Sequence, residues 1–142
     1  MNITEITSTK TQAAVRLRLA PYCRVSSDSA DQLHSFAAQI RYYSDYAKKH
    51  PEYQLVDIYA DEGITGTEMK KRDELKRLIA DCKKGKVDRI IVKSVSRMAR
   101  NTEELLVMIR MFKDIGVSVY FEEQGIDTEK LNMEMIVTFP GM

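Results

Sequence analysis

The chain has 142 residues, of which 44% are hydrophobic and 30% are charged, and its formal net charge is +1. A chain of this length buries roughly two thirds of its unfolded surface, which is enough for one hydrophobic core, and no apolar run approaches the ~20 residues of a membrane span. The composition excludes a low-complexity chain, and the near-neutral charge predicts weak DNA binding by this chain alone, because tight DNA binding needs a basic excess.

Cysteine and histidine are sparse and scattered. Cys23 and Cys82 lie far apart, and His34 and His50 are isolated in the sequence. This spacing argues against a disulfide framework and a zinc site, so we expect a reduced, cytoplasmic protein that uses no metal and no cofactor. The first residues are rich in Thr and Ser and lack the apolar core of a secretory signal. We interpret residues 1–13 as a flexible tail, followed by one domain over residues 14–142.

The first half of the chain alternates strand and helix patterns. Residues 15–25 predict a strand, in which Pro21 lacks an amide donor and is expected to leave the strand bulged or locally unpaired. Residues 32–49 predict an amphipathic helix that ends before Pro51. Its expected apolar face consists of Leu33, Phe36, Ala37, Ile40 and Tyr43. Residues 54–60 predict the second strand, and a loop rich in Gly and Thr follows it.

The second half continues the alternation. A helix is predicted over residues 73–84, and residues 88–92 are a β-branched run typical of a strand covered on both faces. Asn101 and Glu104 form a capping pattern for a helix that continues to residue 115, residues 117–121 predict a strand, and residues 128–139 have a helical pattern. Such alternation predicts an α/β fold in three layers, with a mainly parallel central sheet flanked by helices.

Candidate functional side chains follow the predicted strands. In a parallel sheet, the carboxyl ends of the strands meet at one edge, where ligands bind. Gln32 and Gln39 are seven residues apart and are expected on nearly the same face of the first helix. The other candidates at this edge are Tyr22, Arg24 and Ser26 after the first strand, Asp61 after the second, and Lys93, Ser96, Arg97 and Arg100 after the third.

Arginines around a hydroxyl group suit phosphoryl transfer. Their planar, forked donors hold non-bridging phosphate oxygens, and a serine can attack the phosphorus atom. Covalent attack conserves the phosphoester bond, so a broken strand can be resealed without ATP. The base that takes the serine proton stays open at this point. It is either Asp61 or water, with an arginine then acting through its charge alone.

The ordered motifs resemble those of a known family. They are YCRVSS at residues 22–27, the pair Gln32 and Gln39, DEGITG at 61–66, and KSVSRMARN at 93–101. Together they resemble the catalytic domain of serine recombinases, the resolvases and invertases. The resemblance is nearest to the large serine recombinases of phages and conjugative or mobilisable transposons, in which a serine is common at the position of Ser96.

The resemblance implies site-specific recombination of double-stranded DNA for the integration or excision of a mobile element, without metal. It implies that Ser26 attacks the DNA and forms a 5′-phosphoserine link, while Arg24, Arg72, Arg97 and Arg100 bind the phosphate. The pocket would be lined by Tyr22, Gln32, Gln39, Asp61, Lys93 and Ser96.

The same resemblance implies a dimer that pairs into a synaptic homotetramer at the bacterial nucleoid. It further implies that the chain ends before a long dimerisation helix and separate DNA-binding domains, so that this part alone is inactive.

Three other interpretations are compatible with parts of the sequence. A flavodoxin-like module would use the same loops to bind an anion or a protein partner without catalysis. A metal-dependent nuclease would need clustered carboxylates at the strand ends, where Asp61 and Glu62 are the one adjacent pair. An assembly role would use Met133 and Met135 in a subunit contact, although methionine at helical spacing is more often part of a core.

Overall fold

The computed structural model describes residues 16–26, 30–63 and 72–131. Over these residues, the strands form one six-stranded sheet in the order β2-β1-β4-β5-β6, with β3 also paired to β1. The expected N-terminal tail, the interior of the Gly/Thr loop and Met133 and Met135 lie outside the described residues.

The sheet is mainly parallel, as the alternation of elements predicts. β1 (Leu17–Ser26) lies in the centre, and β4 (Arg89–Val92) and β5 (Ser118–Phe121) follow in parallel register on one side. The short β6 (Ile126–Asp127), which the sequence pattern did not indicate, pairs antiparallel with β5. The parallel strands therefore bring their carboxyl ends to a common edge.

The expected second strand is two strands. β2 (Tyr53–Leu55) pairs with the start of β1, and β3 (Tyr59–Gly63) pairs with its end, so the single strand predicted over residues 54–60 was wrong. Pro21 lies at the change of partner. Leu17 N–H and Leu19 C=O both form hydrogen bonds on the side of β1 that faces β2. Because the backbone groups of every second residue point to the same side of a strand, the Pro21 nitrogen also points to this side, at the place where the hydrogen bonds between β1 and β2 have ended. On the other side, pairing with β4 runs through Pro21 without a break.

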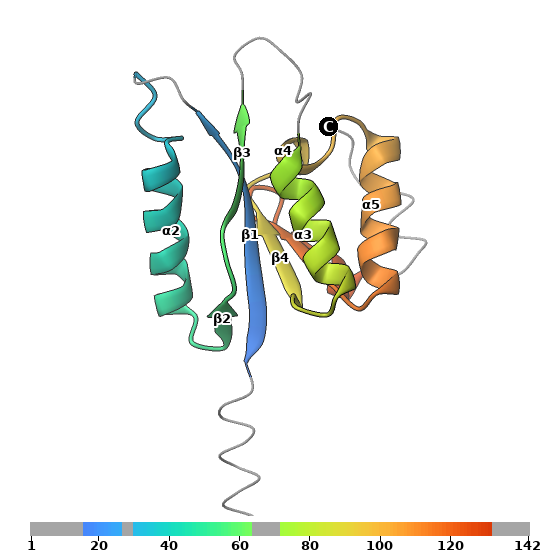
Figure 1. The fold of residues 1–142 in the computed structure, drawn as a ribbon. Coiled ribbons are helices and arrows are strands. Elements are labelled where there is room, and N and C mark those ends of the chain that lie inside the picture. Colours follow the sequence, from blue (N-terminus) through green and yellow to red (C-terminus); the bar gives the residue numbers. More distant parts are fainter. Residues whose placement is uncertain (1–15, 27–29, 64–71, 132–142) are drawn as a thin grey trace, which may run out of the picture.

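Helices cover both faces of the sheet and complete three layers (Figure 1). α2 (Phe36–Lys49) packs on one face, where Tyr43 joins Leu19, Cys23 and Ile91 in a small core cluster. The opposite face carries the larger cluster and the remaining helices, which are α3 (Asp73–Lys83), α4 (Val95–Met98) and α5 (Thr102–Asp114). In the part of the chain that the structure describes, no helix is long and apolar enough to cross a membrane.

The start and the apolar face of α2 differ from the prediction. The helix begins at Phe36, because the Ser35 hydroxyl accepts a hydrogen bond from Ala38 N–H and caps it. Gln32 therefore precedes the helix and does not share a helical face with Gln39. Of the predicted apolar face, Tyr43 alone is buried; Leu33, Phe36, Ala37 and Ile40 are exposed.

The capping pattern predicted for α5 is confirmed. Asn101 Oδ1 accepts a hydrogen bond from Glu104 N–H at 2.8 Å, and the helix ends at Asp114, before Gly116 with its φ of 78°. Of the helix predicted over residues 128–139, the described part is a single 3-10 turn, η1 (Thr128–Lys130). The longer strands and helices thus follow the sequence pattern except where pairing with β1 or a cap decides the boundary, whereas the short α4 and β6 were not predicted.

An ion pair at the start of β1 makes stability depend on pH. Arg18 donates to both carboxylate oxygens of Asp88 at 3.0 Å and holds the pKa of Asp88 below its ordinary value. A carboxylate with a lowered folded pKa stabilises the fold above its unfolded pKa, and this contribution is lost as the pH falls. Asp88→Asn should lower the unfolding free energy by less than about 1 kcal/mol at pH 7, since both side chains are partly exposed.

Urea unfolding at pH 7 and at low pH checks this expectation. The difference between Asp88→Asn and wild type should shrink as the pH falls below about 4, where the unfolded carboxylate protonates. Asp45→Asn, on an exposed position of α2, is the matched control and should show no such change. A difference for Asp88→Asn that is independent of pH would contradict the electrostatic account.

Candidate active site

Several predicted side chains meet in a narrow crevice at the carboxyl edge of the sheet. The crevice has a volume of about 10 Å³, roughly the space of one water molecule. Its lining consists of Tyr22, Cys23, Arg24, His34, Gln39, Tyr43, Lys93 and Arg97. Five of the predicted residues are thus brought together from β1, α2, α4 and the end of β4.

Ser26 is the last residue of β1 and lies two residues beyond Arg24, on the same face of the strand. Its N–H donates to the His34 carbonyl at 2.7 Å, which ties the end of β1 to the segment leading into α2. Gln39 Nε2 donates to the Leu33 carbonyl at 3.1 Å, so the same segment is also held from within the helix. These bonds fix the backbone that carries the Ser26 hydroxyl.

Asp61 is a buried junction between β1 and α3. Its Oδ2 accepts from the Tyr22 hydroxyl at 2.7 Å and from Leu75 N–H at 3.1 Å, and its Oδ1 accepts from Glu74 N–H at 2.9 Å. Burial raises the pKa of Tyr22 far above its ordinary value, and the Asp61 carboxylate raises it further. Asp61 therefore accepts one hydrogen bond from the Tyr22 phenol and two from N–H groups in the first turn of α3, which have no acceptor within the helix.

Arg72 precedes α3 and is 8% exposed. Its Nη1 donates to the Met98 carbonyl at 3.3 Å, and its Nη2 forms an ion pair with Glu104 Oε1 at 2.9 Å. The same Glu104 oxygen accepts from the N–H of Arg100 at 2.9 Å. Arg72 and the backbone of Arg100 thus share one carboxylate, although neither residue lines the crevice.

Arg97 lies in α4, and its N–H donates to the Ser94 carbonyl at 3.1 Å. Ser96 is exposed on the same helix, with its hydroxyl 3.1 Å from that of the buried Ser94. Cys23 lies beside Arg97, but burial raises the pKa of its thiol to about 12 and the Glu122 carboxylate adds to this effect. Cys23 is therefore protonated at neutral pH and is not an activated nucleophile.

Gly63 makes room for Arg24. It pairs with Ser26 across β1 and β3, and a Cβ atom at this position would lie 2.9 Å from Arg24 Nε and 3.0 Å from Arg24 Cγ. The absence of a side chain thus lets the Arg24 guanidinium group lie along β3. The DEGITG motif contains this glycine, but the sequence alone did not indicate which side chain needs the space.

The sequence motifs imply DNA cleavage with Arg24 as a phosphate-binding group. On that expectation, Gly63→Ala should slow DNA cleavage roughly tenfold or more, because displacing such a group by about 1 Å can cost up to 10²-fold in rate. Arg24 is flexible, so it can move without unfolding the sheet, and the melting temperature should change little. Single-turnover cleavage and thermal unfolding check the two expectations. Wild-type cleavage by Gly63→Ala would mean that Arg24 does not need its present position.

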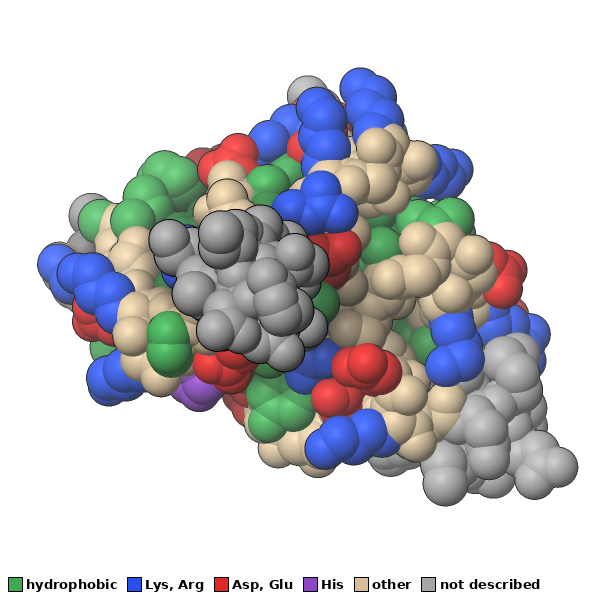
Figure 2. Space-filling model, turned by 90° about the horizontal axis from the view of Figure 1, so that it is seen from below, with side chains coloured by type: hydrophobic (Ala, Val, Ile, Leu, Met, Phe, Trp, Pro, Cys, Tyr) green, Lys and Arg blue, Asp and Glu red, His purple; other side chains and the backbone are tan. Residues whose placement is uncertain are grey.

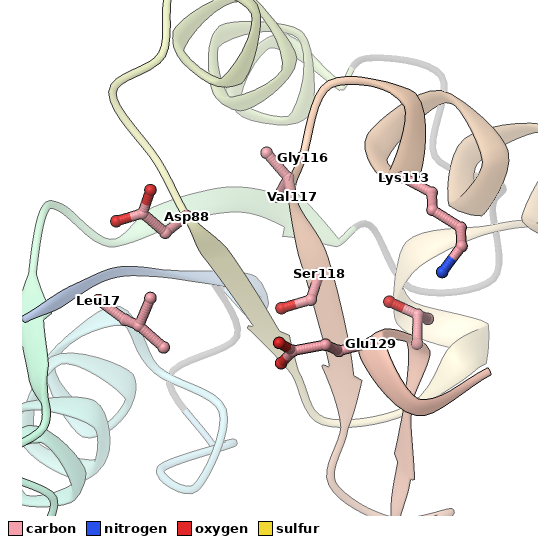
Figure 3. Close-up of a pocket in the computed structure, with 8 residues that line it drawn as sticks. Leu17, Asp88, Lys113, Gly116, Val117, Ser118 and Glu129 are labelled. Atoms are coloured by element: carbon pink, nitrogen blue, oxygen red, sulfur yellow. The ribbon is translucent and has the colours of Figure 1, made fainter. Parts of the chain in front are cut away.

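Two larger hollows are present among the described residues. A groove of about 650 Å³ shares His34, Gln39, Tyr43 and Lys93 with the crevice and continues from it between α2 and the end of β5. A hollow of about 300 Å³ lies at the opposite end of the sheet, and Asp88 and Glu129 are among the residues that line it (Figure 3). Asp88 is already paired with Arg18 there. The groove, and not the distant hollow, belongs to the candidate site.

The face at the amino ends of the strands mixes acidic and basic side chains (Figure 2). In the part of this face that the structure describes, the mixture therefore leaves no continuous positively charged surface that could bind a polyanion. Over residues 16–26, 30–63 and 72–131, no group of three His, Cys, Asp or Glu side chains is arranged to hold a metal ion.

The structure therefore brings together only part of the site that was predicted from the sequence. Gln32, Ser96 and Arg100 are exposed and lie outside the lining of the crevice, and Ser26, Asp61 and Arg72 also lie outside that lining. Two contributors were missed: Gly63 beside Arg24, and Glu104 between Arg72 and Arg100. The capping pattern of Asn101 and Glu104 gave a signal for Glu104, but it pointed to the helix start and not to Arg72.

Two curated relatives are named as resolvases, one of them also as a recombinase. A resolvase/recombinase of Pseudomonas putida is 30% identical over 122 residues, which cover 86% of this chain and 60% of that protein. A resolvase of Clostridium perfringens (strain 13 / Type A) is 32% identical over 102 residues, which cover 71% of this chain and 47% of that protein. The chain thus spans between about half and three fifths of the length of these relatives.

Solved structures have the same fold. A resolvase family site-specific recombinase from Streptococcus pneumoniae superposes with a TM-score of 0.69 at 30% identity, over 87% of this chain and 83% of that chain. The N-terminal catalytic domain of TP901-1 integrase gives a TM-score of 0.70 at 25% identity, over 85% of this chain and 89% of that chain. The family model described as the N-terminal domain of resolvase matches residues 19–142. The expected recognition is confirmed: the chain belongs to the resolvase family, the serine recombinases.

Proposed function

We propose that the chain is the catalytic domain of a site-specific DNA recombinase that cuts and rejoins DNA through Ser26. The observation that carries this proposal is the crevice at the carboxyl edge, where Arg24, Lys93 and Arg97 gather beside the end of β1. Ser26 does not line this crevice, but it follows Arg24 by two residues on the same face of β1, and cationic donors near a serine suit an attack on a phosphodiester. The similarity to proteins named resolvase and recombinase supports the same reaction class.

In the proposed step, the Ser26 oxygen attacks the scissile phosphorus atom. A Ser–O–P bond forms, the bond from phosphorus to the 3′ oxygen breaks, and the 3′ oxygen leaves as a hydroxyl after taking up a proton. The negative charge on the non-bridging oxygens is held by Arg24, Arg72, Arg97 and Arg100. The reverse step, with a new 3′-hydroxyl as nucleophile, reseals the strand without ATP.

Asp61 is a positioning residue in this proposal and not the base for Ser26. Both of its oxygens already accept hydrogen bonds, from the Tyr22 hydroxyl and from two N–H groups of α3. This geometry favours the alternative in which the serine proton leaves to water while the arginines lower the energy of the developing charge.

The partner we propose is double-stranded DNA, with dimers that pair into a synaptic homotetramer. The chain spans only part of the length of its curated relatives, and we propose that residues 14–142 are the catalytic domain and that the dimerisation helix and the DNA-binding domains belong to other parts of the whole protein. The reaction would take place on the bacterial nucleoid, in the cytoplasm.

Trapping of the covalent intermediate tests the proposal. The whole recombinase is incubated with DNA that carries an end of its mobile element, under conditions that stop the reaction after cleavage and with EDTA present. Mass spectrometry should find a 5′-phosphate adduct on the peptide that contains Ser26. An adduct on another residue, or cleavage that requires added metal, would overturn the proposal. The second of these outcomes would favour a metal-dependent nuclease.

A further inference from the structure

We infer that Glu104 is a positioning residue of the phosphate site, which holds the Arg72 side chain and the Arg100 main chain in one arrangement. A single oxygen, Glu104 Oε1, lies 2.9 Å from Arg72 Nη2 and 2.9 Å from the Arg100 nitrogen. This inference rests on the proposed function, because the purpose of the arrangement is to present arginines to a phosphate.

The first reason is the burial of the Arg72 charge. The Arg72 side chain is 9% exposed, whereas that of Glu104 is 33% exposed. A guanidinium group that is removed from water needs a counter-charge and hydrogen-bond acceptors. Among the described residues, the Met98 carbonyl accepts a hydrogen bond from Nη1, whereas Nε and Nη2 have no hydrogen-bond partner, so the Nη2 contact with Glu104 is an ion pair without hydrogen-bond geometry. Glu104 is thus the carboxylate that balances the charge of Arg72.

The second reason is that Glu104 connects separate elements. Arg72 lies at the start of α3, where its carbonyl accepts from Lys76 N–H at 2.9 Å. Glu104 lies in the first turn of α5, and its own N–H is capped by Asn101. One carboxylate therefore fixes the distance between the starts of α3 and α5, which carry Arg72 and Arg100 into the site.

The third reason is that Glu104 stays ionised. Burial raises the pKa of Glu104, but the hydrogen bond from Arg100 N–H and the Arg72 guanidinium group outweigh this effect and hold the pKa below its ordinary value. A helix cap alone would need only an oxygen that accepts a hydrogen bond. A negative charge is needed because Arg72 is buried and positive.

The variants Glu104→Gln and Glu104→Ala separate the role of Glu104 as an acceptor for Arg100 N–H from its role as the counter-charge of Arg72. Glutamine keeps an oxygen for Arg100 N–H and loses the charge that faces Arg72, whereas alanine loses both. Glu103→Gln is the matched control, since it removes the same charge from an exposed neighbour on the same helix. The probe is inorganic phosphate, titrated against the chain at constant ionic strength, with the arginine Nε–H signals followed by NMR.

In the wild type, phosphate should shift the Nε–H signals of the site arginines. Glu104→Gln should raise the phosphate Kd about fivefold or more, as expected when a charge-assisted contact loses its partner, while Glu103→Gln stays within about twofold. A wild-type Kd in Glu104→Gln would overturn the positioning role alone. Absence of phosphate shifts in the wild type would overturn the phosphate site as well, so the two failures are distinguishable.

Cleavage by the whole recombinase gives a second readout. At saturating DNA, Glu104→Gln should cleave roughly tenfold more slowly while its Kd for DNA changes by less than about twofold, because misplaced groups slow the step without removing the contacts that bind DNA. A purely structural role of Glu104 predicts that glutamine, which preserves the cap, restores the wild-type rate. That result would overturn the inference.

Discussion

Replacement of Ser26 with alanine should lower DNA cleavage by about 10⁴-fold or more, as is usual when an essential nucleophile is removed. The hydroxyl at the end of β1 is the group that would form the covalent link, and alanine has no atom that can attack phosphorus. The Ser26 N–H bond to the His34 carbonyl involves the main chain, so alanine can keep it. The fold and the position of the arginines should therefore be preserved.

The measurement compares single-turnover cleavage, DNA affinity and thermal unfolding of wild type and Ser26→Ala. Affinity should change by less than about twofold, since it depends mainly on contacts with the DNA backbone. Ser27→Ala is the matched control, because it removes the neighbouring hydroxyl group. Retained cleavage in Ser26→Ala together with loss of cleavage in Ser27→Ala would identify Ser27 as the nucleophile. Retained activity in both variants would favour a DNA reaction that uses no serine.

Replacement of Asp61 with asparagine should destabilise the fold by about 2–3 kcal/mol, because charge-assisted hydrogen bonds are lost and a buried donor is left unpaired. Asp61 is 5% exposed and accepts three hydrogen bonds. Asparagine can offer one acceptor oxygen, but its NH₂ group then faces an N–H of α3 in either orientation, that of Glu74 or that of Leu75. Cleavage should slow as well, since Arg72 lies directly before α3.

Urea unfolding measures this loss, and Asp73→Asn is the control. Asp73 is an exposed carboxylate in the first turn of the same helix, so its replacement should cost only about 0.5 kcal/mol through the helix dipole. The double variant Asp61→Asn/Tyr22→Phe should lose less than the sum of the single losses, because both changes affect the same Tyr22–Asp61 hydrogen bond. If Asp61→Asn is as stable as wild type but inactive, with a changed pH dependence of cleavage, Asp61 would be a base after all.

Local sequence patterns predicted most of the elements. The β-branched run at residues 88–92 and the capping pair of Asn101 and Glu104 lead to β4 and α5 with boundaries shifted by one residue. These elements were predictable because burial on both faces and helix capping are local properties with a clear signature. The mainly parallel sheet follows from their alternation with helices.

The errors arose where contacts distant in sequence decide the structure. The division into β2 and β3 depends on how both strands pair with β1, which no local pattern reports. Gln32 was placed on α2 because the apolar periodicity extends backward past Ser35, although the Ser35 side chain caps the helix there. The space that Gly63 leaves for Arg24, and the link from Glu104 to Arg72, join residues whose proximity appears only in the folded chain.

The change of strand partner at Pro21 has a consequence for how this domain tolerates variation in length. The proline nitrogen falls where β1 leaves β2 and has not yet met β3, and the last bond on the β2 side is from Val56 N–H to the Leu19 carbonyl. Residues inserted between Val56 and Tyr59 would lengthen an unpaired connection, and loops absorb such changes far better than paired strands do. The register of Arg24 with Asp61 is set by β3 alone. The sequence and length of the segment around β2 can therefore change without shifting the pairing of β3 with the end of β1, where Arg24 and Ser26 lie.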